Sequence, residues 1–425
     1  MAPIISIEKL YSIFLSSQGI CTDTRKLQKG CIFFALKGSN FNGNLFAEQA
    51  LKEGAIVVVD EPQKIANDKI ILVDDALKTL QELATHHRHQ LQIPFIAIAG
   101  SNGKTTTKEL IHSVLSTTYN TFATQGNLNN HIGVPLTILS LKKDTEMAVI
   151  ELGANHLHET AFLCDILQPD FGLITNNGKD HLEGYGNIEN VKKGNGELFD
   201  FLKLNNGIAF VNANDADLMG ASAALKRITY GNRSANIAGE IISDNPFLKI
   251  EWNNKLINTQ LFGKYNFDNI LCAIAIGTYF KVSDENICKG IESYVPKNNR
   301  SQVVQLNSNT IVVDCYNANP SSMSLAIESF AGLTAPKKLL ILGDMFELGE
   351  FSNREHKEIL NLIEQKQFSN VVLVGTEFAK ADTTTKYKHF TTTPELKKWF
   401  DENHFSNYSI LLKGSRGMAL EKLLG

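Results

Sequence analysis

The sequence predicts an α/β protein with three domains: a small α/β domain at the N-terminus, a central parallel-sheet domain with a phosphate-binding loop, and a Rossmann-like α/β domain at the C-terminus. Three observations predict this class. A chain of 425 residues is longer than one hydrophobic core normally serves. Short apolar runs alternate with helical patterns, as in βαβ units. The run Phe95–Ala99 is apolar without a break, which is typical of a strand covered on both faces. We place the domains at residues 1–92, 93–297 and 298–425.

The composition argues against several classes of protein. Hydrophobic residues make up 43% and charged residues 20% of the chain, which is usual for a globular protein and unlike a disordered one. The net charge of -4 gives no general attraction to nucleic acid or to an anionic membrane. The six cysteines show no zinc or disulfide spacing, and neither a signal peptide nor a membrane span is apparent. We therefore expect a cytoplasmic monomer that neither binds nucleic acid nor inserts into a membrane.

The first segment ends in a long helix. Before it we expect strands at 31–38 and 55–61 and a helix at 46–53. Residues 76–91 carry leucines at helical spacing, and the Ile-Pro step at 93–94 disfavours helix where the central strand begins. His86, His87 and His89 suggest a metal site, but they fall on the polar face of this helix, so we expect them to be solvated.

A tight turn joins the strand Phe95–Ala99 to a helical pattern. Gly100 and Gly103 let the backbone bend and point its NH groups towards an anion, where the helix N-terminus adds partial positive charge. Lys104 would reach the outer phosphates of a polyphosphate, and the Thr105 hydroxyl would bind Mg²⁺. The usual motif has four residues between its glycines, whereas only two intervene here. The strand before the turn and the helix after it still favour a nucleotide site.

The rest of the chain repeats the strand-then-helix order. In the central segment we expect strands at 147–152, 171–175 and 208–212, followed by a hairpin at 248–262 whose turn is Asn253-Asn254. The third segment starts near Pro296 and has four apolar runs that each end in a polar loop, at 310–320, 337–349, 370–375 and 408–417. Loops at the carboxyl ends of parallel strands are where ligands bind in such sheets.

Three motifs carry a resemblance to a known family. The loop GSNGKTTTKE, with NLNNHIGVP at 127–135 and ELGANH at 151–156, resembles the Mur ligases, and further matches extend from Cys21 to Arg416. The resemblance implies an ATP- and Mg²⁺-dependent ligase of peptidoglycan synthesis. It would join D-alanyl-D-alanine to UDP-N-acetylmuramoyl-tripeptide through an acyl phosphate.

The resemblance also implies roles for individual residues. The catalytic residues would be Lys104, Glu151, His181 and Arg300. Thr105, Glu151 and His181 would bind Mg²⁺. The nucleotide would meet Gly100, Ser101, Asn102, Gly103, Lys104, Thr105, Thr106, Asn266, Asn269, Arg300 and Asp314. Without the resemblance, Asn266 and Asn269 are typical of helix caps and Arg300 of a surface arginine.

One position departs from the family pattern. Related ligases place a carbamylated lysine fourteen residues after the histidine, and this chain has Asn195 there. Loss of a unit charge about 4 Å from a divalent ion costs several kcal/mol at an effective dielectric of about 20. We therefore expect either that Lys192, three residues earlier on the same helix face, carries the carbamate, or that water fills the gap.

The substrates are assigned by the same resemblance. Asp23, Thr24 and Arg25 would bind the UDP end, and the loop beside it would contain Lys37, Gly38, Asn42 and Gly43. The peptide arm would meet Asn127, Asn129 and Asn130. D-alanyl-D-alanine would meet Tyr316, Asn317, Asn319 and Ser322, with its carboxylate on Lys413 or Arg416. Family members commonly have Asp-Gly-His where this chain has Asn-Gly-Asn at 42–44.

Two other readings remain open. A sister ligase that adds one amino acid, or a folate polyglutamylating enzyme, would share the phosphate loop. A nucleotide-binding regulator without catalysis would explain Asn195. The sequence does not say whether the third stem residue is diaminopimelate or lysine.

Overall fold

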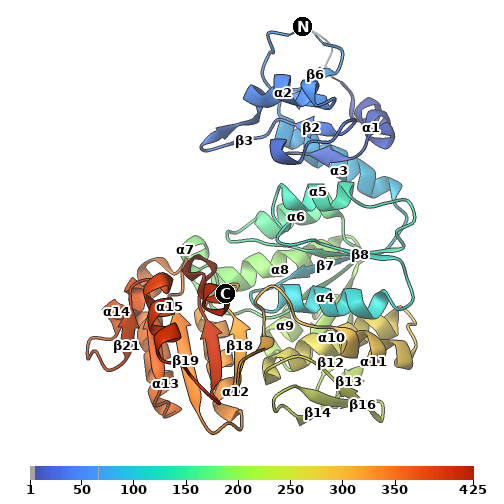
Figure 1. Ribbon diagram of the computed structural model, residues 1–425. Coiled ribbons are helices and arrows are strands. Elements are labelled where there is room, and N and C mark those ends of the chain that lie inside the picture. The colour runs from blue at the N-terminus through green and yellow to red at the C-terminus, as the bar shows by residue number, and fades with distance from the viewer. Residues whose placement is uncertain (1–4, 66) are drawn as a thin grey trace. The chain divides into compact units, whose positions relative to one another are not determined.

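The computed structural model describes residues 5–65 and 67–425 (Figure 1). The fold is α/β throughout, and the chain divides into two compact units. The first unit comprises Met1–Ala97, Asn120–Gly153 and Thr160–Phe171, and the second Ile98–Tyr119, Ala154–Glu159 and Gly172–Gly425. Within the described residues, no helix combines the length and apolar character that crossing a bilayer would need.

The first unit contains a small parallel sheet. Its strands, in the order β1-β2-β5-β6, are Ile20–Cys21, Ile32–Phe34, Ile56–Val59 and Ile70–Leu72, and all neighbours are parallel. The helices are α1 (Ile7–Ser16), α2 (Ala47–Lys52), α3 (Ala76–Gln90), α5 (Gly133–Leu139) and α6 (Glu159–Leu167). A hairpin joins β3 (Lys37–Gly38) to β4 (Phe41–Asn42), and β8 (Thr121–Ala123) is parallel to β9 (Met147–Glu151).

The expected solvation of all three histidines on α3 is wrong for one of them. His89 is exposed and His86 half-buried, but His87 is only 5% exposed. The Tyr11 hydroxyl of α1 lies 3.1 Å from its Nδ1 atom. Because α1 packs on α3, this side of the helix is covered, and His87 is a buried residue whose Nδ1 atom has a partner.

The strand β7 (Phe95–Ala99) has the predicted bounds and is buried along its whole length. It leads into α4 (Lys104–Leu115), which packs on α10 (Phe267–Tyr279) and α11 (Asp284–Ser293). The strands β10 (Phe171–Ile174), β11 (Ile208–Asn212), β12 (Lys226–Gly231) and β13 (Ile237–Ala238) are consecutive neighbours in the second unit. The helices α7 (Leu182–Tyr185), α8 (Ile188–Leu204) and α9 (Ala216–Ala221) connect them.

The predicted hairpin is confirmed. It pairs β15 (Lys249–Trp252) with β16 (Lys255–Asn258), and Asn253 and Asn254 have φ angles of 52° and 58°, as a tight hairpin turn requires. A third strand, β14 (Glu240–Ser243), was not expected. It pairs with β15 in an antiparallel manner.

The C-terminal part forms a six-stranded sheet (Figure 1). Its order β17-β18-β22-β19-β20-β21 joins Gln302–Leu306, Asn309–Asp314, Ser409–Lys413, Lys338–Gly343, Val371–Val374 and Lys388–Phe390. Only the β17–β18 pair is antiparallel. The helices are α12 (Pro320–Gly332), α13 (Ser352–Gln365), α14 (Thr376–Ala381) and α15 (Thr393–Glu402).

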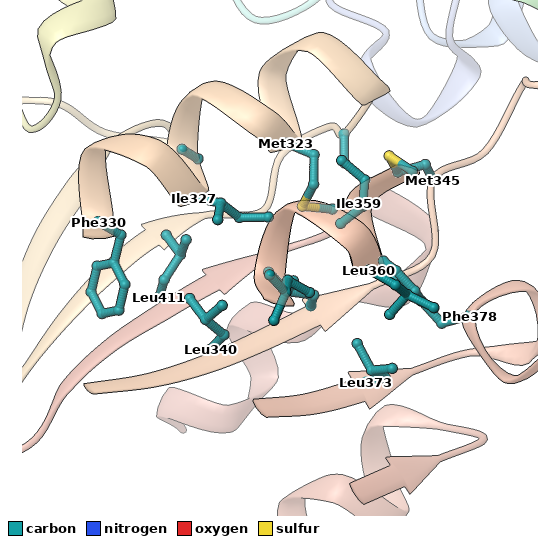
Figure 2. Close-up of a cluster of buried hydrophobic side chains, with 14 of the residues drawn as sticks. Met323, Ile327, Phe330, Leu340, Met345, Ile359, Leu360, Leu373, Phe378 and Leu411 are labelled. Carbon is teal, nitrogen blue, oxygen red and sulfur yellow. The ribbon is translucent and has the colours of Figure 1, made fainter. Parts of the chain in front are cut away.

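Alternate residues of these strands belong to two separate cores. Leu340, Leu373 and Leu411 face α12 and α13, as Figure 2 shows, where Ile327 and Phe330 pack on them. Neighbouring strand residues such as Ile341 and Leu412 pack instead with α15 and the C-terminal turn Leu420–Leu424. This is the pattern of a sheet covered on both faces, and it agrees with the α/β domain predicted for this segment.

A small deletion tests this core. Ile327→Val removes one methyl group from a fully buried side chain and is expected to lower the free energy of unfolding by about 1 kcal/mol. Urea denaturation measures the loss. The exposed Leu325 on the same helix is the control, since Leu325→Ala should change stability by less than about 0.5 kcal/mol. Equal effects would contradict the assignment of Ile327 to the core.

Candidate functional site

The phosphate loop has the backbone that its glycines predict. Gly100 and Gly103 have φ angles of 118° and 81°. A Cβ atom on Gly100 would lie 2.3 Å from the Thr175 hydroxyl, and one on Gly103 would lie 2.9 Å from Asn269 Oδ1. No other residue therefore fits at either position without displacing its neighbours. Gly103 also precedes α4 without any side-chain cap, so the helix N-terminus is left for an anion.

Lys104 lies over its own loop. Its Nζ atom donates to the carbonyl oxygen of Gly100 and, at 3.2 Å, to that of Ser101. The ammonium group is half-buried, and within the part of the chain that the structure describes it bonds these two carbonyl groups and forms no ion pair. It can therefore turn towards a phosphate without breaking an ion pair. These features fit the binding of a nucleoside triphosphate.

Asn266 and Asn269 lie beneath the loop. Asn269 Oδ1 accepts from the Thr107 hydroxyl at 3.0 Å, and its amide donates to Asn266 Oδ1 at 3.0 Å. Asn266 in turn donates to the carbonyl oxygen of Phe262. Both are buried, so the structure gives them a supporting role, and their predicted contact with adenine stays a prediction.

His181 lies on the loop that follows β10. It has a left-handed backbone, with φ of 46°, and its Nδ1 atom forms an ion pair with Glu347. Burial lowers the pKa of His181, but Glu347 and Asp180 outweigh burial and raise it overall, while Lys104 opposes them. The Glu347 carboxyl, bonded to His181, has a lowered pKa.

Glu151 ends β9 in the first unit and is 3% exposed. Its Oε1 atom accepts from Asn129 Nδ2 at 2.9 Å. Asn129, predicted to meet the peptide arm, therefore holds a carboxylate predicted to bind Mg²⁺. Asn127 and Asn130 are exposed, and Asn130 Oδ1 accepts from the backbone of Gly133.

Within the part of the chain that the structure describes, the residues predicted to bind Mg²⁺ do not belong to a metal-binding cluster of acidic, histidine or cysteine side chains. Among the described residues, no three His, Cys, Asp or Glu side chains lie together as a metal-binding group. Mg²⁺ usually keeps several waters and takes one or two protein carboxylates plus substrate phosphates. Thr105 and Glu151, together with phosphate oxygens, have the right donor chemistry, and their assignment stays a prediction.

At the departure from the family pattern, the contacts of Lys192 argue against a carbamate on this side chain. Asn195 is buried, and its Nδ2 atom donates to Asn177 Oδ1 at 2.9 Å. Lys192 pairs with Asp217 at 2.8 Å and with Glu189 at 3.2 Å. The hydrogen bond to Asp217, followed by that to Glu189, raises the pKa of Lys192. Carbamylation starts from the neutral amine, which these ion pairs disfavour.

We therefore expect Lys192→Ala to leave the rate of ligation unchanged, because the lysine only joins two surface carboxylates. Removing bicarbonate from the assay should also have no effect. Phosphate release under CO₂-free buffer measures both. A rate that falls without bicarbonate and is abolished by Lys192→Ala would contradict this expectation and assign the carbamate to Lys192.

At the carboxyl edge of the C-terminal sheet, two predicted residues bind each other. Lys413 Nζ lies 2.7 Å from Asp314 Oδ2, and the Lys413 side chain is 2% exposed. Asp314 Oδ1 accepts from the Ser301 backbone at 3.1 Å. Lys413 is thus occupied, so of the two residues predicted for the dipeptide carboxylate the structure favours the exposed Arg416.

Tyr316 holds two arginines. The guanidinium of Arg300 lies 3.8 Å from the centre of its ring and that of Arg416 5.1 Å away. Arg416 also donates to the Tyr316 hydroxyl at 3.3 Å. The exposed Asn317 side chain accepts a hydrogen bond from the Ala318 backbone. Asn319 caps α12, and its side chain and that of Ser322 each accept from the other residue's backbone. Tyr316 thus places two guanidinium groups close to one ring, and their predicted contacts with anionic groups stay predictions.

The predicted uridine-diphosphate residues are joined by ion pairs. Asp23 accepts from Arg25 at 2.8 Å and 2.9 Å, and these hydrogen bonds lower the pKa of Asp23 to about 2. Lys37 pairs with Asp60 and Glu61. Thr24 starts the short helix of Arg25, and Gly38 is exposed in the β3–β4 hairpin. Within residues 42–44, the middle position must be glycine, because a Cβ atom on Gly43 would lie 2.6 Å from the Ala35 backbone.

Sequence reasoning found His181 but missed the rest of its loop, residues 176–180, and the partners of that loop. Asn176 bonds the phosphate loop at Ser101 and Asn102. Lys179 pairs with Glu355, whose side chain is fully buried. The burial of Glu355 could not be predicted from the sequence, since α13 carries no motif.

Comparison with known proteins gives one consistent family. Residues 16–88 match the family described as Mur ligase family, catalytic domain; 98–277 match Mur ligase middle domain; and 299–416 match Mur ligase, glutamate ligase domain. The chain is 35% identical over 422 residues to UDP-N-acetylmuramoyl-tripeptide--D-alanyl-D-alanine ligase of Bacillus subtilis, covering 96% of this chain and 92% of the relative.

Solved structures agree. A MurF crystal structure from Acinetobacter baumannii is 30% identical with a TM-score of 0.85, covering 97% of this chain and 96% of that one. A MurF ligase from Thermotoga maritima, in complex with ADP, is 25% identical with a TM-score of 0.85, and 97% of each chain is covered.

Proposed function

Because the chain belongs to the Mur ligase family, we propose that it joins D-alanyl-D-alanine to UDP-N-acetylmuramoyl-tripeptide with ATP and Mg²⁺, the last cytoplasmic step of stem-peptide synthesis. One observation carries the proposal. The second compact unit contains both the phosphate loop before α4 and the C-terminal sheet whose loops are predicted to bind the dipeptide. A hydrogen bond between Asn102 and Asn319 joins the two. ATP and the substrates of an amide-forming reaction must be held close together for the reaction to occur.

The chemistry requires activation of a carboxylate, which offers no leaving group to an amine. An oxygen of the tripeptide carboxylate bonds to the γ-phosphorus of ATP, and ADP leaves. The dipeptide amine then attacks the carbonyl carbon, and phosphate departs. Because the α-amine has a pKa near 8, part of it is unprotonated at neutral pH, so the site need only orient it and accept one proton.

The chain's own residues orient these groups and neutralise charge. Lys104, on the first turn of α4, would lie between the two anions that must approach. Mg²⁺ would add further positive charge at the phosphates. Arg300 and Arg416, both against Tyr316, would meet the γ-phosphate and the dipeptide carboxylate respectively.

The proposal includes that the protein acts as a monomer in the cytoplasm. Residues predicted for the nucleotide and for both substrates all lie on one chain, so no second copy is needed to complete the set. ATP and a UDP-linked substrate are cytoplasmic compounds.

The test is phosphate release and product mass with purified protein, ATP, Mg²⁺ and both substrates, repeated with each omitted. Phosphate and product should appear together and only when all are present. ATP binding without turnover would instead favour the regulator. Product formed from a single amino acid, and not from the dipeptide, would favour a sister ligase.

A further inference from the structure

The loop of residues 176–181, here called the coupling loop, is bonded to the phosphate loop on one side. The Ser101 backbone donates to the Asn176 carbonyl oxygen at 2.9 Å. Asn176 Nδ2 donates to the Asn102 carbonyl oxygen at 3.0 Å, and its Oδ1 accepts from the Asn102 backbone at 3.2 Å. The Ser101 hydroxyl reaches the Gly178 carbonyl oxygen at 3.2 Å. A change in the phosphate loop must therefore move or restrain the coupling loop.

The same loop is bonded to the C-terminal lobe on its other side. The Lys179 backbone donates to the Ser321 hydroxyl at 2.8 Å. Its ammonium group lies 2.8 Å from Glu355 and 2.9 Å from Glu358. The Glu355 side chain is fully buried, and among the described residues its one other cationic partner is Arg354, at 2.8 Å, so Lys179 supplies much of the compensating charge. His181, as described, pairs with Glu347.

Asn319 joins all three parts. Its Oδ1 atom accepts from the Ser322 backbone at 2.8 Å and so caps α12. Its Nδ2 atom donates to Asn102 Oδ1 in the phosphate loop at 2.8 Å and to Asp180 Oδ1 in the coupling loop at 3.0 Å. Asn319 and Asp180 are 5% and 6% exposed, so water does not compete strongly for these bonds. A cap alone would need only the oxygen.

We propose that Asn319 and Lys179 are positioning residues that transmit occupancy of the phosphate loop to α12 and the lobe that would bind the amine substrate. The inference rests on the proposed function only in taking the loop at 100–105 as the nucleotide site. Nucleotide binding restrains Asn102 and Asn176, and through Asn319 and Lys179 it restrains the start of α12. Nucleotide and amine substrate thus favour the same arrangement of the lobe, and by linkage each strengthens the binding of the other.

Amide hydrogen exchange on the full chain tests this without any turnover. ADP with Mg²⁺ should slow exchange at residues 100–107 and, about fivefold, at residues 320–324, fivefold being the lower end of usual coupling factors. Asn319→Ser keeps a capping oxygen for α12 but is too short to bond the phosphate loop. In this variant the response at 320–324 should disappear while that at 100–107 persists.

Lys179→Gln is the second variant, because it removes the charge but leaves the backbone bond to Ser321. It should reduce the response at 320–324. Lys386→Gln breaks an exposed ion pair with Glu364 in the same lobe and is the matched control, with a full response expected.

A full response in both variants, or none at 320–324 in the natural chain although ADP binds, would overturn the inference and leave the function standing. If ADP fails to bind at all, the proposed function itself fails. Should Asn319→Ser not fold, the response of Lys179→Gln decides alone.

Discussion

Replacing Lys104 by alanine is expected to lower the rate of ligation at least about a hundredfold, the usual effect of removing one group that stabilises charge in a transition state. Two anions must come into contact before the carboxylate can take a phosphoryl group, and Lys104 is the cation that the phosphate loop itself supplies. Phosphate release at saturating substrates measures the loss.

Stability should not change with this substitution, because Lys104 bonds only backbone oxygens of its own loop and alanine is a good helix former. Lys203→Ala, at an exposed position in the last turn of α8, is the control and should ligate normally. Ligation that survives in Lys104→Ala would contradict the role of the loop.

Replacing Lys413 by methionine is expected to lower the free energy of unfolding by about 3 kcal/mol, the cost of leaving one member of a buried ion pair alone. The variant keeps the volume of the side chain but, among the described residues, leaves the Ser301 backbone as the one donor to the Asp314 carboxylate. Urea denaturation, with its midpoint and slope, measures the change.

The double variant Lys413→Met with Asp314→Asn should recover most of that loss, because no charge is left without its partner. Lys255→Met, which breaks an exposed ion pair with Glu285, should cost less than about 1 kcal/mol. If Lys413→Met is as stable as the natural chain, Lys413 is available to the dipeptide and its assignment to Asp314 is wrong.

Local sequence predicted the elements whose surroundings are uniform. Phe95–Ala99 is buried on both sides, so its unbroken apolar pattern alone gives its bounds, and Gly100 and Gly103 are fixed by backbone angles that other residues avoid. The strands β14, β17 and β21 were missed because they are short or carry many polar residues, and their neighbours in the sheet decide their conformation.

The candidate site was predictable wherever one residue acts through a local motif. Contacts between distant segments were not. Asp314 and Lys413 are 99 positions apart in the sequence, and Lys179 and Glu355 are 176 positions apart. No local sequence pattern predicts such pairs. His87 shows the same limit, since its burial depends on the packing of α1 against α3.

Transfer of oxygen from the acid to phosphate tests the central claim most directly, because only an acyl phosphate moves a substrate oxygen onto phosphorus. The tripeptide is prepared with ¹⁸O in its terminal carboxylate, and the phosphate released during ligation is analysed by mass. The account predicts one ¹⁸O atom in each phosphate that accompanies a product. Phosphate free of ¹⁸O, released while product forms, would contradict it.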